Sequence, residues 1–235
     1  MHSPMFSYQI IQTKLLVEDI SQIFLLPAPL ANAAERSFIY EAGQYVNIHY
    51  EEGYAPLSIA SAPRKDQQLE FHLSHPVRNA KAQKLWRLAL QAQCWQLSEA
   101  IGDCRVDRLN RNQPIIFLAY ETGFAPIKAV IEALVQSLPL PPLFLYWMGA
   151  SSTQFYLTSL LEKWTTQFNF TYFPLVVPER NFSTEHLFSA ILQHHQGFSH
   201  YQVYASGPRT LMQAAYKFFI ENGLQQNDFY SDLAP

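Results

Sequence analysis

The sequence predicts an N-terminal antiparallel β-barrel followed by an α/β domain with a parallel sheet. Before about residue 110, short apolar segments are separated by turn residues, and only one clear helical pattern occurs. After residue 113, apolar strands alternate with long helical segments, a pattern typical of a parallel sheet with helices on both faces. The polar run 110–113 separates the two patterns, so we expect domains at residues 1–110 and 111–235.

The first domain is expected to consist mostly of strands. Pro27 and Pro29 end the second strand, because proline is poorly tolerated inside sheets. The helical segment places Leu85, Trp86 and Ala89 on one face. Short strands at this spacing with a single helix predict a small barrel. The predicted strands span 6–16, 20–26, 45–50, 57–60 and 69–73, and the helix spans 79–92.

The second domain is organised around residues 114–134. A run of mainly apolar residues leads into the turn Glu121-Thr122-Gly123, and Pro126 fits the first turn of the helix that follows. Such a unit presents free helix amides to a ligand phosphate, although this stretch alone favours an ordinary strand–turn–helix connection. The remaining predicted strands are 143–147, 170–176 and 201–205, and the helices are 125–137, 155–168, 183–193 and 210–222.

Composition excludes several classes of protein. Hydrophobic residues make up 49% and charged residues 15%, which indicates a globular chain with a substantial core. The net charge of −3 argues against a nucleic-acid partner. No apolar run approaches the ~20 residues of a transmembrane helix, and the N-terminus lacks the pattern of a signal peptide. We therefore expect a cytoplasmic protein with no transmembrane segment.

Cysteine and histidine spacing predicts no metal site. Cys94 and Cys104 are too few for a four-cysteine iron–sulfur cluster, and a disulfide is not expected without an export signal. The histidines show no HExxH or Cys-His spacing. We expect both cysteines to be unpaired, in or beside strands.

Three predicted strands of the parallel sheet end at a glycine. These glycines are Gly123, Gly149 and Gly207. Ligands of open parallel sheets bind beyond the carboxyl ends of the strands. Each glycine is a weak signal, but their coincidence favours a small-molecule site.

The order of several motifs resembles the ferredoxin–NADP reductase superfamily, especially its flavin reductases and the reductase components of oxygenases. The resemblance covers nearly the whole chain and implies a flavin-binding-type barrel and an NAD(P)-binding-type α/β domain. It also implies that a flavin lies between them and accepts a hydride at N5 from a nicotinamide nucleotide. The motifs are APLSIAS, ETGFAPIKAVIEAL, LYWMGASSTQFY, YASGPRTLM and FYSD.

The resemblance also assigns roles to individual residues. It implies that the hydroxyl groups of Ser58, Thr122 and Ser206 position the reacting rings. Further cofactor contacts are implied for the turns and strands around them. These residues are Pro56, Leu57, His72, Leu73, Ser74, Gly123, Pro126, Gly149, Gly207 and Pro208.

Several residues depart from the superfamily pattern. Ala55 replaces an arginine that holds a flavin phosphate, and Leu57 replaces a stacking aromatic ring. Tyr120-Glu121 replaces Gly-Gly, which adds a negative charge where a pyrophosphate would approach. Ser151 replaces an arginine, which favours NADH over NADPH.

Two functions remain open from the sequence. The first is a flavin-linked NADH oxidoreductase that uses FAD or FMN, held loosely as a substrate, and passes electrons to a separate acceptor. The second is a degenerate, non-catalytic protein that keeps the fold and acts as a binding or regulatory partner.

Overall fold

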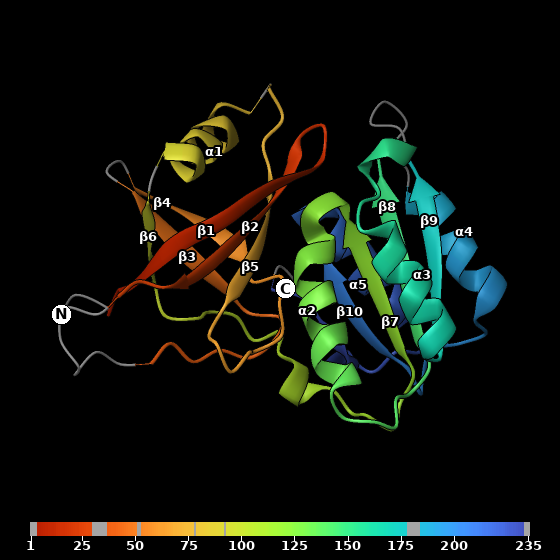
Figure 1. Ribbon diagram of the computed structural model, residues 1–235. Helices are drawn as coiled ribbons and strands as arrows, with labels where there is room; N and C mark the ends of the chain where they lie inside the picture. The colour runs from red at the N-terminus through yellow and green to blue at the C-terminus, as the bar shows by residue number, and fades with distance from the viewer. Residues whose placement is uncertain are drawn as a thin grey trace.

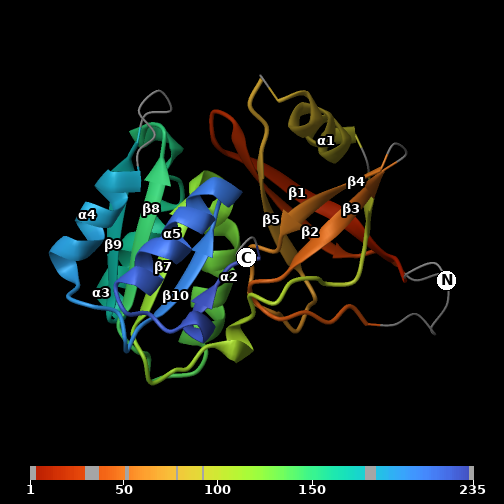
Figure 2. The ribbon, with the colours of Figure 1, turned by 180° about the vertical axis from the view of Figure 1, so that it is seen from behind.

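The protein was analysed as a computed structural model, which describes residues 4–29, 37–50, 53–77, 79–91, 93–177 and 184–232. The chain forms two units that lie side by side, the first built on an antiparallel sheet and the second on a parallel one (Figure 1). Helix α2 (Phe124–Val135) lies on the side of the parallel sheet that faces the first unit, as the view from behind also shows (Figure 2).

The antiparallel sheet of the first unit closes into a barrel. Its strand order is β4-β3-β6-β1-β2-β5, and a further bridge between Ile59 and Phe71 joins the end of β4 to β5. The two outer strands of this order therefore meet, which confirms the predicted barrel. The strands are β1 (Phe6–Val17), β2 (Ile20–Pro27), β3 (Tyr45–Tyr50), β4 (Gly53–Ser58), β5 (Leu69–Ser74) and β6 (Cys94–Leu97), and α1 spans Ala80–Gln91.

Strand β5 is buried on both faces, and the two faces differ in chemistry. Leu69, Phe71 and Leu73 point into the barrel core, where Ile23 and Trp95 also pack. Glu70 and His72 alternate with them and are equally buried, but they face the second unit. Because successive side chains of a strand point to opposite faces, one short segment serves both the barrel core and the contact with α2.

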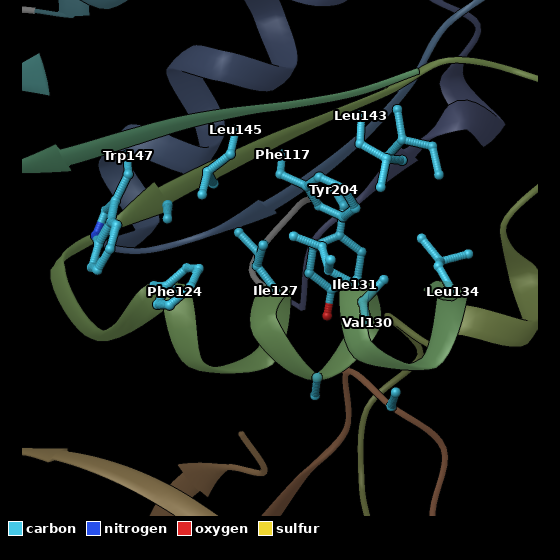
Figure 3. Close-up of a cluster of buried hydrophobic side chains, with 14 of the residues drawn as sticks. Phe117, Phe124, Ile127, Val130, Ile131, Leu134, Leu143, Leu145, Trp147 and Tyr204 are labelled. Atoms are coloured by element: carbon cyan, nitrogen blue, oxygen red, sulfur yellow. The ribbon is translucent and has the colours of Figure 1, made fainter. Parts of the chain in front are cut away.

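The second unit is a parallel sheet with helices on both faces, as predicted. Helix α2 packs Phe124, Ile127 and Ile131 onto one face of the sheet, against Phe117 and Trp147 among others (Figure 3). The strand order is β11-β10-β7-β8-β9. The strands are β7 (Ile115–Tyr120), β8 (Leu143–Gly149), β9 (Phe170–Val176), β10 (Gln202–Ser206) and β11 (Phe229–Tyr230), and the other helices are α3 (Thr158–Gln167), α4 (Thr184–His194) and α5 (Arg209–Glu221).

Several boundaries differ from the prediction. Strand β4 begins at Gly53 and ends at Ser58, so the strand predicted at 57–60 is displaced. Strands β6 and β11 were not predicted, because four and two residues are too few to show a period. Helix α3 starts at Thr158 rather than at residue 155, because Leu157 has a φ of 54°, outside the range of a right-handed helix.

The connection between the sheets runs from the end of β6 to the start of β7. It includes a 3₁₀ turn at Val106–Arg108, just before the predicted domain boundary at 110, which stays a prediction. Cys94 is exposed on β6 and Cys104 is buried in this connection, and both are unpaired. No helix in the described part of the chain is both long and apolar enough to cross a membrane.

Candidate functional site

The C-terminal ends of β7 and β10 are in close contact at the candidate site. Residues Glu121–Gly123 make one 3₁₀ turn after β7, and α2 follows directly at Phe124. A Cβ atom added to Gly123 would lie 2.2 Å from the carbonyl oxygen of Ser206. The φ of Gly123 is −56°, which any residue can adopt, so glycine is needed here for close approach rather than for an unusual backbone conformation.

Two adjoining cavities lie between the barrel and this edge of the parallel sheet. The first has a volume of about 320 Å³ and the second about 350 Å³. They share Pro56 and Ser58 from the barrel and Ser206 and Gly207 from β10 and its end. Volumes of this order are typical of small-molecule sites.

Most of the predicted site residues line these cavities. Pro126 lines the first cavity, and Leu57, His72, Thr122, Gly123 and Pro208 line the second.

Three predicted site residues line neither cavity. Leu73 lies in the barrel core because the alternation of β5 turns it away from His72. Ser74 pairs with Ile20 at the end of β5, and Gly149 lies against Gln154 at the end of β8.

Hydroxyl groups are the main hydrogen-bonding side chains that the cavities offer. Ser58, Thr122 and Ser206 are each partly buried. Within the described ranges, none of their side chains is hydrogen-bonded to the protein, so all three are available to a ligand. No lysine or arginine lines either cavity among the described residues, whereas Glu121 and Asp232 do. The site therefore suits an uncharged polar ring system better than a phosphate.

Comparison with known proteins relates the chain to reductases that use nicotinamide nucleotides or flavins. The model of the oxidoreductase NAD-binding domain matches residues 117–217. A CDP-6-deoxy-L-threo-D-glycero-4-hexulose-3-dehydrase reductase of Yersinia pestis is 29% identical over 92% of this chain and 64% of its own length. An NAD(P)H-flavin reductase of Vibrio harveyi is 26% identical over 78% of this chain and 81% of its own. The chain is therefore similar to NAD(P)H-flavin reductases and related reductases, the proteins that its motifs resemble.

Solved structures support the same fold. The cytochrome P450 reductase GcoB of Amycolatopsis matches with a TM-score of 0.80 at 16% identity, covering 100% of this chain and 72% of its own. The chain spans less than two thirds of the length of the Yersinia relative. The predicted two-part fold is thus confirmed, and the reductases among the relatives agree with the resemblance of the motifs.

Glu121 takes an unusual backbone conformation in the turn after β7. Its φ is 47°, in the left-handed region that glycine adopts most easily. Its carbonyl oxygen accepts a hydrogen bond of 2.9 Å from Trp147 Nε1, and its carboxylate accepts one of 3.3 Å from Gln154 Nε2. Gln154 Oε1 in turn accepts from the amide of Ala150. The negative charge is therefore held between the ends of β7 and β8.

Sequence reasoning missed several residues of the first cavity, among them Tyr45, Cys104, Tyr204 and Asp232. They come from segments far apart in the chain. Tyr204 and Asp232 belong to quoted motifs but were given no role, whereas Tyr45 and Cys104 lie outside every quoted motif. Burial raises the pKa of the Cys104 thiol, and the nearby Asp232 carboxylate raises it further, so this thiol stays protonated. Desolvation likewise raises the pKa of the Asp232 carboxyl group.

Tyr204 connects the parallel sheet to the barrel. Its buried hydroxyl donates to the carbonyl oxygen of Cys104 at 3.0 Å and lies 3.3 Å from that of Gly43. A Tyr204→Phe variant leaves these acceptors without their donor, so we expect a loss of about 1–2 kcal/mol in urea unfolding. Tyr230 pairs with Tyr204 across the sheet and donates to the exposed carbonyl of Arg108.

Tyr230→Phe is the matched control. It removes the donor to the carbonyl oxygen of Arg108, but this oxygen is exposed, so a water molecule can donate to it instead. We expect it to lose less than about 0.5 kcal/mol. Equal losses in the two variants would contradict a bridging role for Tyr204.

Proposed function

We propose that the chain transfers a hydride from NADH to a flavin and that the electrons then pass to a separate acceptor. The observation that supports this most directly is the shared lining of the two cavities. Ser58 comes from the barrel, whereas Thr122 and Ser206 come from the parallel sheet, and all three hydroxyls are available. Two ligands in adjoining cavities would meet between these side chains.

The side chains that line the cavities fit the ring of a flavin better than its phosphate. Pro56, Leu57 and Pro126 provide apolar walls, and the hydroxyls match uncharged ring nitrogens and carbonyls. Ala55 lies on β4 beside Pro56 and cannot make the charge-assisted contact that an arginine makes with a phosphate. We therefore propose that flavin is a loosely held substrate.

The residues of the chain would act mainly by positioning. A bound flavin supplies the group that accepts a hydride. Ser58, Thr122 and Ser206 would orient the two rings by hydrogen bonds. In the described part of the chain, no lysine or arginine lines the cavities, so proximity rather than charge would account for the rate.

NADH is proposed as the nucleotide donor. Ser151 offers no guanidinium to a 2′-phosphate, and the fixed negative charge of Glu121 disfavours additional phosphate groups nearby. We propose a separate molecule as the electron acceptor. The sequence has two cysteines, and no metal-binding group of three side chains occurs among the described residues.

A non-catalytic binding role is the second candidate. The position of Glu121 favours it, because the carboxylate occupies the space between β7 and β8 where a dinucleotide phosphate would approach. Flavin binding and NADH oxidation separate the two candidates.

Flavin titration tests the proposed function. Quenching of flavin fluorescence is expected to give dissociation constants for riboflavin and FMN within about threefold of each other, because no lysine or arginine among the described residues lines either cavity. Added flavin should support oxidation of NADH, followed at its absorbance band. If none of riboflavin, FMN and FAD binds and NADH is not oxidised, the reductase proposal fails.

The Ala55→Arg/Leu57→Tyr double variant tests the fit more sharply. A charge-assisted contact and a stacking ring should tighten FMN binding by about tenfold or more, with a smaller change for riboflavin. Ala55→Gln/Leu57→Tyr is the control, because it adds length without charge. Equal gains for FMN and riboflavin would show that no phosphate lies near residue 55.

A further inference from the structure

A buried lysine joins the two units outside the cavities. Lys128 lies on α2, only 4% exposed. Its ammonium group donates to the carbonyl oxygen of Ala60 at 2.9 Å, to Glu70 Oε2 at 2.8 Å and to Glu132 Oε1 at 2.7 Å. An ammonium group has three hydrogens, so every donor of Lys128 is used. Two of these acceptors belong to the barrel, and the third is on α2 itself.

The carboxylates around Lys128 are held by further donors. Glu70 Oε1 accepts from Gln22 Nε2 at 2.7 Å and lies 2.8 Å from His72 Nε2. Glu132 Oε2 accepts from the amide of Ala62 at 3.2 Å. Burial by itself would raise the pKa of Glu70, but the hydrogen bond with His72 and the charge of Lys128 lower it to about 2. Glu70 is therefore an ionised carboxylate that only accepts hydrogen bonds.

This geometry defines the state of His72. Because Glu70 only accepts, the hydrogen of the imidazole lies on Nε2, and Nδ1 accepts from the hydroxyl of Tyr156 at 3.0 Å. Burial lowers the pKa of His72, which outweighs the opposing effect of Glu70, and Lys128 lowers it further. The positive charge that balances Glu70 thus comes from Lys128, and His72 is neutral.

We propose that Lys128 is a positioning residue that sets, through Glu70, the protonation and orientation of His72 in the wall of the second cavity. Without the ammonium group, the buried charge of Glu70 has to be balanced by a proton, either on Glu70 or on His72. A proton on His72 turns Nδ1 into a donor and reverses the hydrogen bond with Tyr156. A proton on Glu70 removes the charge that selects the tautomer.

Nitrogen NMR of the His72 ring in the full chain, free of ligand, tests this proposal directly. With ¹⁵N-labelled histidine, and His72→Gln to assign the signal, the wild type is expected to show one neutral tautomer protonated at Nε2. In Lys128→Met we expect a proton affinity of His72 at least about tenfold higher, or a mixture of tautomers. An unchanged tautomer and titration in folded Lys128→Met would overturn the proposal.

Two further variants serve as a control and as a substitute in case Lys128→Met does not fold. Lys217→Met is the control, because Lys217 is an exposed lysine whose partner Glu221 lies four residues on, as Glu132 does from Lys128. It should leave the His72 signal unchanged. If Lys128→Met fails to fold, Lys128→Met/Glu70→Leu removes both buried charges and with them the cost of an unpaired one. His72 then lacks its acceptor, so persistence of the wild-type tautomer there would also overturn the proposal.

The link to the second cavity rests on the proposed function and needs a separate measurement. Flavin affinity is expected to fall by about tenfold in Lys128→Met and to stay unchanged in Lys217→Met. If wild type binds no flavin, the reductase proposal fails, whereas the His72 signal still decides the role of Lys128. Unchanged flavin affinity in a variant with an altered His72 signal would overturn the link to the cavity.

Discussion

Replacing Gly123 by alanine is expected to cost about 2–3 kcal/mol of folding free energy and to abolish ligand binding at the strand ends. The added Cβ would lie 2.2 Å from the carbonyl oxygen of Ser206 and 2.8 Å from its carbonyl carbon. Both atoms belong to the backbone of β10, where Ser206 pairs with Ala119 of β7. The two strand ends cannot separate without breaking this pairing, so the strain falls on the turn that carries Thr122.

Gly149→Ala is the matched control for this prediction. Its added Cβ would meet the side chain of Gln154 at 3.2 Å, and a flexible side chain can move. We expect a loss below about 1 kcal/mol. Urea unfolding and flavin titration of both variants provide the measurement, and a Gly123→Ala protein as stable as Gly149→Ala would contradict the close contact.

Acid is expected to destabilise the chain through Glu70. The pKa of Glu70 is about 2 in the folded protein, against an ordinary value of 4.5. The unfolded chain therefore takes up a proton before the folded chain does, so this stabilisation is present above about pH 4.5 and is lost as the pH falls toward 2. Between about pH 5 and pH 3 the loss from this one group is about 2 kcal/mol.

Two buried histidines are expected to make the folding stability depend on pH at higher pH values as well. Burial lowers the pKa of His72, and it lowers that of His195, with help from His194, to about 4. Unfolded histidines bind protons at a higher pH than these folded ones, so stability declines already as the pH falls below about 6.5. His195 lies between the hydroxyls of Tyr146 and Tyr201, which suit a neutral ring.

Urea unfolding at a series of pH values measures these effects. Glu70→Gln should flatten the curve between about pH 5 and pH 3 while leaving the decline nearer pH 6 in place. Asp107→Asn, which removes an exposed partner of Arg105, should keep the wild-type slope. An unchanged slope in Glu70→Gln would show that the Glu70 carboxylate is not the buried anion that the contacts with Lys128 and His72 indicate.

Local pattern was sufficient to predict most elements and the edge of the sheet where the site forms. Apolar runs of six or seven residues, each followed by a helical period, predicted the parallel sheet, because strands buried on both faces are continuously apolar. Parallel strands share the direction of their carboxyl ends, so Thr122, Gly123 and Ser206 could be expected at one edge. Strands β6 and β11 were not predicted, because strands of four and two residues are too short to show a period.

Tertiary structure was needed to show which distant residues meet. Closure of the barrel turns Glu70 and His72 of β5 toward α2, and helix packing places Lys128 opposite them. Tertiary packing also brings Cys104 and Tyr204 to the first cavity and holds Glu121 between β7 and β8. Periodicity along a chain defines the faces of one element at a time. The partners of those faces depend on register and packing between segments dozens of residues apart, which no local pattern encodes.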